Sequence, residues 1–282
     1  MCADTQSRKR VLLARFIDDF RIIIAHTDEQ LQRAHELRYE VFLRELNYDL
    51  GADQHLALEQ DIFDGRALHC LIEHRESGLT AGYVRLVFPS DDPENLLPLI
   101  HSTGHLFTAP ELHPLHLPEH QVCEISRLVI SRHFRSRVVP AVENAEARLP
   151  TRQFSSDQRR TFSLIVIALF LCSHALVTLS ERRHIFALME SSLPRLLSLS
   201  GFHFQRVSTM IDYCGTRGTF YIDNQQASQD MIGDLNELYQ HIERQLNQQL
   251  RELPQAYFRN VRFATNHRDQ ARESAGHSSQ AP

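Results

Sequence analysis

The segment QVCEISRLVIS, residues 121–131, decides the centre of the fold. Its valines and isoleucines are typical of a β-strand. Glu124 and Arg127 stand three positions apart, so a regular strand would point their side chains to opposite faces. A β-bulge between them would bring both side chains to one face, and bulges are common beside active sites. We therefore predict a bulged strand that carries a carboxylate and a guanidinium on the same face.

Alternating strands and helices flank this segment. Strands are predicted at residues 20–26, 67–74, 81–89, 184–190, 202–207 and 218–223. Helices are predicted at residues 28–47, 164–179, 191–200 and 227–252, and Gly201 is expected to end the third of them. This order predicts a single α/β or α+β domain with a mixed central sheet flanked by helices. We expect the domain to span 20–224, with an N-terminal extension (1–19), a C-terminal helical segment (225–258) and a disordered tail (259–282).

Composition and charge limit the class of protein. A formal net charge of -5 over 282 residues argues against a general nucleic-acid binder. The five cysteines are odd in number, scattered and without a CxxC pair, which fits reduced thiols in a cytoplasmic protein. No apolar core of signal-peptide length precedes Asp18, so we expect no export.

The long apolar run LIVIALFLCSHALVTL, residues 164–179, is too short for a membrane span and contains Ser173 and His174. We therefore expect a buried central helix. Because arginines flank both ends of the run, a peripheral membrane contact is the alternative.

Three histidines, His113, His116 and His120, lie close together in the stretch HPLHLPEH. Prolines interrupt this stretch, and it holds no HExxH-like pair that one helix face would present to a metal ion. We therefore predict a polar loop here, and we expect neither a metal ion nor a bound cofactor in this protein.

The segment RYEVFLRELNYDL, residues 38–50, has the periodicity of an amphipathic helix. Helical spacing places Arg38 on the same side as Val41 and Phe42, so its guanidinium points toward the core. A buried guanidinium needs an anionic partner. The alternatives to a role in a site are a structural ion pair and a side chain that reaches solvent from the edge of the apolar stripe.

The segment EQDIFD brings three carboxylates, those of Glu59, Asp61 and Asp64, close together ahead of a strand. They repel one another unless cations or a bound amine balance them, although such runs are also common in solvated loops. Arg85 lies in a strand that is apolar on both faces, where a charge requires a partner. We predict that Arg38 lies within salt-bridge reach of one of these carboxylates or of Glu124.

The order and spacing of these residues resemble those of the acyl-homoserine-lactone (autoinducer) synthases and the N-acyl amino acid synthases, two branches of the GNAT-like acyl-CoA N-acyltransferase fold. The spacings RxxxF, ExDxxD and ExxR all hold, and the matching residues are Arg38, Phe42, Tyr48, Glu59, Asp61, Asp64, Arg85, Glu124 and Arg127. Two features depart from the pattern. Tyr48 stands where autoinducer synthases usually have tryptophan, and no glycine-rich loop follows SRHFRSR (131–137). A closer likeness, over about residues 20–250, is to the acyltransferases associated with PEP-CTERM/exosortase gene clusters.

The resemblance implies transfer of a long-chain acyl group from an acyl carrier protein or acyl-CoA thioester to the amine of a small acceptor such as an amino acid, without a covalent acyl-enzyme. It implies catalytic roles for Glu59, Glu124 and Arg127, with a carboxylate as general base and backbone N–H groups of the bulged strand on the oxyanion. It assigns substrate binding to Arg38, Phe42, Tyr48, Asp61, Asp64 and Arg85.

Arg132, Arg135 and Arg137 form a local cationic patch that suits an acidic carrier protein, and an ordinary solvated basic turn is the alternative. Two other functions stay open at this point. One is an acyl-homoserine-lactone synthase that uses S-adenosylmethionine. The other is a non-catalytic module that holds an acylated carrier protein.

Overall fold

The computed structural model describes residues 2–48, 50, 55–90, 96–135, 156–231, 233–254 and 257–258. These residues form an eight-stranded sheet in the order β1-β2-β3-β4-β5-β8-β6, with β7 also paired to β8. The strands are β1 (Phe20–Ala25), β2 (Ala67–His74), β3 (Thr80–Val87), β4 (Val122–Ile130), β5 (His184–Glu190), β6 (Gln205–Arg206), β7 (Ile211–Asp212) and β8 (Thr216–Asp223). β4 and β5 pair in parallel and the other described pairs are antiparallel, so the predicted mixed sheet is confirmed.

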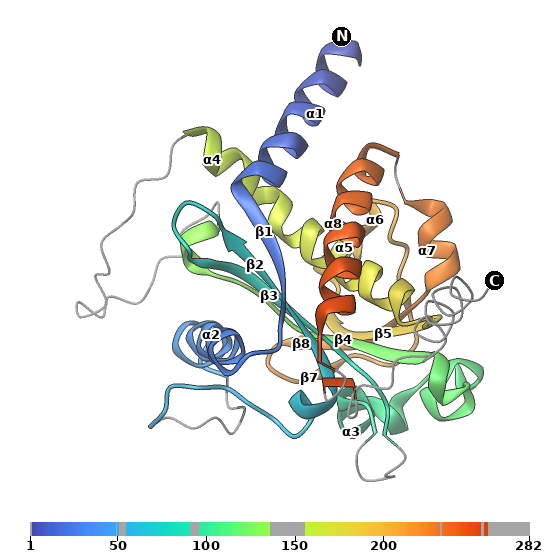
Figure 1. The fold of residues 1–282 in the computed structure, drawn as a ribbon. Coiled ribbons are helices and arrows are strands. Elements are labelled where there is room, and N and C mark those ends of the chain that lie inside the picture. Colours follow the sequence, from blue (N-terminus) through green and yellow to red (C-terminus); the bar gives the residue numbers. More distant parts are fainter. Residues whose placement is uncertain are drawn as a thin grey trace, which may run out of the picture.

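Helices cover both faces of the sheet (Figure 1). They are α1 (Cys2–Asp19), α2 (Asp28–Tyr39), α3 (Pro98–Thr103), α4 (Ser156–Thr161), α5 (Ile165–Leu179), α6 (Ser192–Ser198), α7 (Asn224–Asp230) and α8 (Gly233–Glu252). Successive strand residues point to opposite faces. Leu71 and Tyr83 accordingly pack beneath α2, whereas their neighbours Ile72 and Val84 join the larger core beneath α5 and α8.

The predicted apolar helix is the centre of the larger core. α5 contacts β2, β3, β4 and α8, and nearly all of its side chains are buried. By length and composition the helical stretch Gln158–Leu179 is the one described segment that could cross a membrane, yet 72% of its most apolar window is buried inside the protein. This burial confirms the prediction of a central core helix.

The edge strand β1 is covered by side chains of α8. Gln249 accepts a hydrogen bond from Ile24 N–H at 2.9 Å and donates one to the Ile22 carbonyl at 2.9 Å, and Gln245 accepts from Ile22 N–H at 3.3 Å. An exposed edge strand is a template for pairing with another chain. The glutamines satisfy the backbone groups of this edge.

The predicted bulge in the 121–131 strand is present. Arg85 pairs with Ser126 and Tyr83 pairs with Val129, so two residues of β4 stand opposite one residue of β3. The first of the two is Arg127, whose φ of 55° is unusual for a residue with a side chain. The bulge turns Arg127 away from the face that a regular strand would give it.

Two sequence predictions differ from the structure in extent. A single helix over residues 227–252 is split into α7 and α8, because the chain turns at Met231 against Gly201, where a Cβ atom would lie 2.1 Å from the Asp230 carbonyl oxygen. The predicted strand over 202–207 forms only as the short β6, Gln205–Arg206, although Val207 N–H also donates to the Thr219 carbonyl of β8 at 2.9 Å. Phe202 packs into the core instead. Gly201 ends α6 with φ 91°, as predicted. The predicted tail over 259–282 lies outside the described residues.

Candidate active site

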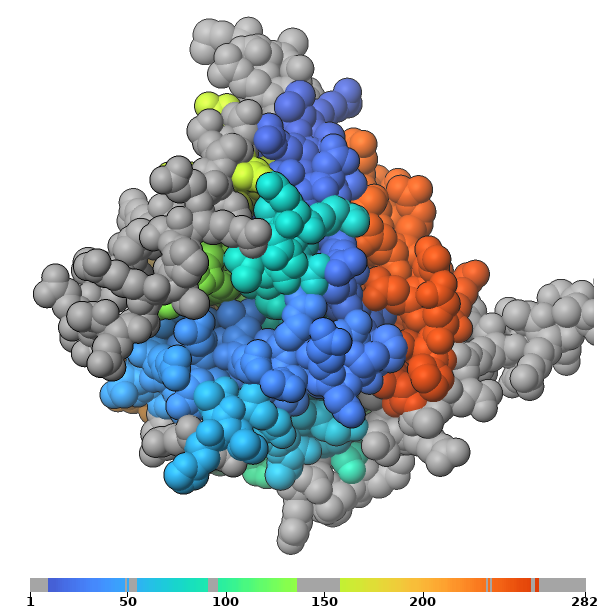
Figure 2. Space-filling model, turned by 60° about the vertical axis from the view of Figure 1, so that its left-hand side comes forward, coloured from blue at the N-terminus to red at the C-terminus, as the bar shows by residue number. Residues whose placement is uncertain are grey.

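Six charged side chains form a buried cluster beneath α2, which we call the ion network: Arg38 (α2), Glu59, Asp61 and Asp64 (between α2 and β2), Arg85 (β3) and Arg127 (β4). Arg38, Glu59 and Arg85 have no solvent-exposed surface. In Figure 2 the light-blue segment that follows residue 55 lies directly beside α2, and Glu59 N–H donates to the His35 carbonyl of that helix at 3.2 Å. Three arginines and three carboxylates therefore face one another with little exposure to solvent.

Arg38, on the apolar side of its helix, is paired with two carboxylates. Arg38 donates through Nε to Glu59 and through Nη1 to Asp64 Oδ1 at 2.6 Å. Its burial confirms the prediction of an ion-paired arginine within reach of the acidic segment and excludes a solvent-reaching side chain. Arg85 donates to Asp61 at 2.5 Å and to Asp64 at 2.6 Å. These carboxylates are the anionic partners that a guanidinium in an apolar strand requires.

Arg127 joins the ion network from the bulge. Its Nε lies 3.2 Å and 3.3 Å from the two carboxylate oxygens of Glu59, and its Nη2 donates to Asp61 Oδ2 at 3.0 Å. A positive φ is unfavourable for a residue that has a side chain, so this backbone conformation persists only where surrounding contacts hold it in place. The contacts of Arg127 with two carboxylates hold its backbone in this conformation.

The arginines keep the aspartates of the ion network ionised. Burial by itself would raise the pKa of Asp64, but Arg85 and Arg38 outweigh it and hold that pKa well below its usual range. The same balance, with Arg85 as the main partner, lowers the pKa of Asp61. Asp61 and Asp64 are therefore ionised at neutral pH and face the guanidinium groups of Arg38 and Arg85.

A histidine and a tyrosine hold the acidic segment in place. His69 accepts from the Tyr83 hydroxyl through Nδ1 at 2.8 Å and donates through Nε2 to the Asp64 carbonyl at 2.9 Å. Burial lowers the pKa of His69 to about 4. The ring is consequently neutral at pH 7, which leaves one nitrogen as an acceptor and the other as a donor, as both contacts require.

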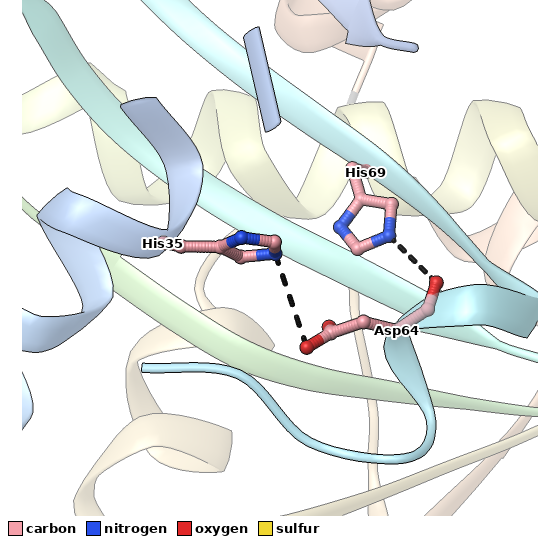
Figure 3. A group of neighbouring side chains, drawn as sticks. All are labelled: His35, Asp64 and His69. Carbon is pink, nitrogen blue, oxygen red and sulfur yellow. Dashed lines mark hydrogen bonds and ion pairs between the residues drawn. The ribbon is translucent and has the colours of Figure 1, made fainter. Parts of the chain in front are cut away.

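His35, Asp64 and His69 are the group of described residues with donor atoms close enough for a metal ion, all within 4.8 Å of one another (Figure 3). Both nitrogens of His69 are already hydrogen-bonded. The Asp64 carboxylate binds two arginines and accepts the Asp61 N–H at 2.8 Å. A dication here would displace these contacts beside guanidinium groups, so the arrangement fits a hydrogen-bonded brace better than a metal site.

A cavity of about 420 Å³ opens where β4 and β5 separate. The parallel ladder between these strands ends at the pair Glu124 and Phe186. Both Glu124 and Arg127 line the cavity, which confirms that the irregular strand delivers them to one cleft. Apolar walls come from residues of β4, α5, β5 and α6, among them Ile125, Phe170, Ala187, Met189 and Leu193.

Glu124 differs from the carboxylates of the ion network because no arginine binds it directly within the described residues. Its side chain is 2% exposed and accepts a hydrogen bond from Leu99 N–H at 2.8 Å. Burial raises the pKa of Glu124 to about 8, against the opposing effects of that N–H and of the more distant Arg85 and Arg127. A carboxyl group with this pKa exchanges a proton near neutral pH.

The predicted site residues thus fall into two sets. Phe42, Tyr48, Glu124 and Arg127 line the cavity. Arg38, Glu59, Asp61, Asp64 and Arg85 lie behind it in the ion network, and Arg127 is the residue common to both.

A π-helical turn, Glu40–Glu45, continues α2 and sets the aromatic part of the cavity wall. Leu46 N–H reaches the Val41 carbonyl at 3.1 Å, and Tyr48 N–H reaches the Phe42 carbonyl at 2.8 Å. The Phe42 and Tyr48 rings consequently stack, with centroids 6.1 Å apart and 21° between their planes. Wider turns of this kind are frequent at functional sites.

The predicted cationic patch is partly neutralised. Arg135 forms an ion pair with Glu45, and Arg132 lies 4.0 Å from Glu40. Arg135 also lines the cavity, whereas Arg137 lies outside the described residues.

The histidine-rich stretch forms short turns, in which His113 binds the Gly104 carbonyl at 3.1 Å and His116 binds the Pro110 carbonyl at 2.7 Å. These contacts engage the histidines with the backbone of their own loop.

Sequence reasoning missed three participants. Ser126 accepts from Arg85 at 3.0 Å, His69 braces the acidic segment, and Arg217 of β8 lines the cavity. His69 and Ser126 are polar residues in the largely apolar strands β2 and β4. A polar side chain in such a strand is the feature of the sequence that could have identified them. Arg217 gave no such signal, because its neighbours in sequence are polar and small.

A family model described as an acetyltransferase (GNAT) domain matches residues 37–143, which include the ion network and β4. No curated protein matches the chain significantly.

Solved structures share the fold at low sequence identity. The AHL synthase LasI is 15% identical and covers 76% of this chain and 96% of its own, with a TM-score of 0.50. The CoA-dependent acyl-homoserine lactone synthase BjaI, solved with MTA, is 15% identical and covers 79% and 89%, with a TM-score of 0.52. FeeM, an N-acyl amino acid synthase from uncultured soil microbes, is 12% identical and covers 78% and 96%, with a TM-score of 0.48.

The fold is therefore GNAT-like, as the sequence predicted. With the acetyltransferase-domain match over its central strands, the protein is an acyltransferase. In fold it is similar to acyl-homoserine lactone synthases.

Proposed function

We propose that the protein transfers a long-chain acyl group from a thioester, on acyl carrier protein or coenzyme A, to the amine of an amino acid. The observation that carries the proposal is Glu124, a buried carboxyl group with a pKa raised to about 8 in the wall of the cavity. The other buried carboxylate of the site, Glu59, is paired with two arginines. An unpaired buried carboxyl group costs stability, and such groups are frequent where proton transfer occurs.

In the proposed reaction the acceptor amine attacks the thioester carbonyl carbon while Glu124 takes a proton from the amine. The C–N bond forms, the carbonyl oxygen becomes negative, and the C–S bond then breaks to release the thiol, which receives the proton. The parallel ladder ends at Glu124, so backbone groups on the β5 side of β4 beyond it are available to stabilise the oxyanion. General-base assistance of this kind contributes about 10²–10⁴-fold.

Glu59 suits a supporting role better than that of the base. Both of its carboxylate oxygens are within hydrogen-bond distance of an arginine, and its side chain has no exposed surface. Glu59 also does not line the cavity, so no acceptor amine bound there would reach it. In this proposal the ion network positions Arg127, and Arg127 and Glu124 face the substrates.

The apolar part of the cavity is the proposed acyl subsite. Phe170 of α5 and Ala187 and Met189 of β5 supply an apolar wall on the side of the larger core. A cavity of about 420 Å³ falls within the range of ligand pockets.

The proposal also includes an acyl carrier protein as the donor and a cytoplasmic location. Arg132 and Arg135 would contact an acidic carrier protein, although Glu40 and Glu45 lower the net positive charge of this patch. The resemblance to acyltransferases of PEP-CTERM/exosortase gene clusters agrees with a cytoplasmic protein that has a carrier protein as partner. A peripheral membrane contact would require the flanking arginines of the central helix, because the apolar face of that helix is buried.

The second candidate is an acyl-homoserine-lactone synthase that uses S-adenosylmethionine. The fold similarity to LasI and BjaI favours it. The two candidates share the donor chemistry and differ in the acceptor.

The test is to incubate the pure protein with acyl carrier proteins and acyl-CoAs of defined chain length, an amino-acid mixture and S-adenosylmethionine, and to identify products by mass. We expect N-acyl amino acids. Glu124→Gln should lower the single-turnover rate by about 10²-fold or more, and the wild-type rate should rise with pH through about 8 as Glu124 ionises.

Glu111→Gln, at an exposed glutamate outside the cavity, is the matched control and should keep the wild-type rate. Deprotonation of the acceptor ammonium to the neutral amine also accelerates the reaction with rising pH, but it does so in both proteins. The part of the pH dependence that is lost in Glu124→Gln therefore belongs to Glu124. Failure to form any acylated amine would refute the proposed function, and a wild-type rate in Glu124→Gln would refute the base.

A further inference from the structure

Arg217 is a cavity residue that the acyl transfer described above leaves unused. It lies at the start of β8, opposite Glu190 of β5 in the sheet register. Its side chain is 22% exposed and lines the cavity that also contains Glu124. A partly buried guanidinium in a largely apolar cavity needs an anion.

The turn before β8 fixes the orientation of this side chain. Arg217 Nε donates to the Cys214 carbonyl at 3.2 Å. Cys214 and Gly215 both have positive φ, 52° and 95°, and Tyr213 N–H closes the turn on the Gly215 carbonyl at 3.0 Å. One edge of the guanidinium is thereby tied to the backbone, and the other edge is directed toward Tyr48, whose hydroxyl lies 3.4 Å from Nη2.

Arg217 is less committed than the other arginines of the site. Arg38, Arg85 and Arg127 each bind two carboxylates of the ion network. The acidic partner of Arg217 is Glu190, at 3.5 Å and half exposed to solvent. Exposed pairs at such a distance contribute little free energy, so an incoming carboxylate can replace Glu190.

An aromatic shelf connects Arg217 to the catalytic part of the cavity. The Arg217 guanidinium lies 5.7 Å from the Tyr48 ring centroid, Tyr48 stacks on Phe42, and the Arg127 guanidinium lies 5.8 Å from the Phe42 ring centroid. The shelf therefore has an arginine at each end. Arg127 is neutralised by the ion network, which leaves the Arg217 end as the more electropositive one.

We propose that Arg217, assisted by the Tyr48 hydroxyl, binds the carboxylate of the acceptor, and that the acceptor is an amino acid with a free carboxylate and no additional cationic group. This inference rests on the proposed function and names the acceptor class. Guanidinium and hydroxyl groups suit a carboxylate, whereas a sulfonium or a second ammonium would meet two arginines along the shelf. With its carboxylate at Arg217, the acceptor presents its amine within the cavity that Glu124 lines.

The experiment uses the full chain and a competition between two sets of probes. An equimolar mixture of amino acids and the corresponding amino acid amides is offered with one acyl donor, and products are quantified by mass. The wild type should favour the carboxylates. Arg217→Gln should lower kcat/KM for the carboxylates by about 10- to 100-fold, mainly through KM, and leave that for the amides unchanged.

A second variant tests the same idea in the opposite direction. Glu190→Gln removes the competing carboxylate from Arg217, so it should lower KM for the amino acids. Arg183→Gln is the matched control, because Arg183 is an exposed arginine that is also paired with a carboxylate, Asp223 at 2.7 Å, and lies outside the cavity lining. If Arg217 were only a structural partner of Glu190, the two variants would not change KM in opposite directions.

Each result has one meaning. Equal use of amino acids and amides by the wild type, or unchanged selectivity in Arg217→Gln, overturns the inference and leaves the proposed function standing. A higher kcat/KM for S-adenosylmethionine than for every amino acid overturns the acceptor class. Absence of any product with the wild type is the distinct failure of the proposed function itself.

Discussion

Replacing the two buried glutamates of the site by glutamine should change stability in opposite directions. Glu59→Gln removes a charge that faces Arg38 and Arg127 with no exposure to solvent. Breaking a buried pair by removing one charge costs about 3–5 kcal/mol. Because Arg38 keeps Asp64 and Arg127 keeps Asp61, we expect the lower end, roughly 3 kcal/mol, which lowers Tm by about 5–10 °C.

Glu124→Gln should instead stabilise the protein at neutral pH. The pKa of Glu124 is about 8 in the folded chain and 4.5 as its ordinary value, so the folded state binds more protons than the unfolded state between these values. Stability associated with Glu124 is present below pH 4.5 and is lost as the pH rises toward 8, by roughly 3 kcal/mol between pH 4.5 and 7. A neutral glutamine avoids this loss, provided that the Leu99 N–H retains its acceptor.

Thermal and urea unfolding of the three proteins from pH 4.5 to 8, with single-turnover rates on the same preparations, would test both statements. The stability difference between Glu124→Gln and the wild type should grow with pH, while Glu59→Gln should be destabilised throughout neutral pH. Equal destabilisation by both variants, with no dependence on pH, would refute the distinction between a paired carboxylate and an unpaired one.

Two further outcomes are expected. The folded pKa of about 4 for His69 lies below its ordinary value of 6.5, so the free energy of unfolding should fall by roughly 3 kcal/mol as the pH is lowered from 6.5 to 4, and His69→Gln should flatten this slope in urea titrations. Ala187→Leu should fill part of the apolar cavity wall and shift products to shorter acyl chains, at a cost of about 1–3 kcal/mol in stability; unchanged product masses would remove Ala187 from the acyl subsite.

The sequence specified most of the sheet, because strand and helix patterns are local. Strands β2 and β5 match the predicted residues 67–74 and 184–190, and α5 begins one residue after the predicted start. The prediction failed where a distant contact decided the outcome. The break between α7 and α8 depends on Gly201, thirty or so residues earlier in the chain, and periodicity carries no information about such a neighbour.

The sequence by itself also determined which residue types had to meet. Arg38 on an apolar helix face and Arg85 in an apolar strand required anions, and the acidic segment required cations. Only the tertiary structure decided which pairs form. Arg127 and Glu59 are 68 residues apart and Arg217 and Tyr48 are 169 apart, so their contacts arise from packing. The pKa of Glu124 follows from the same cause, since burial and the absence of a paired arginine among the described residues are properties of the folded chain.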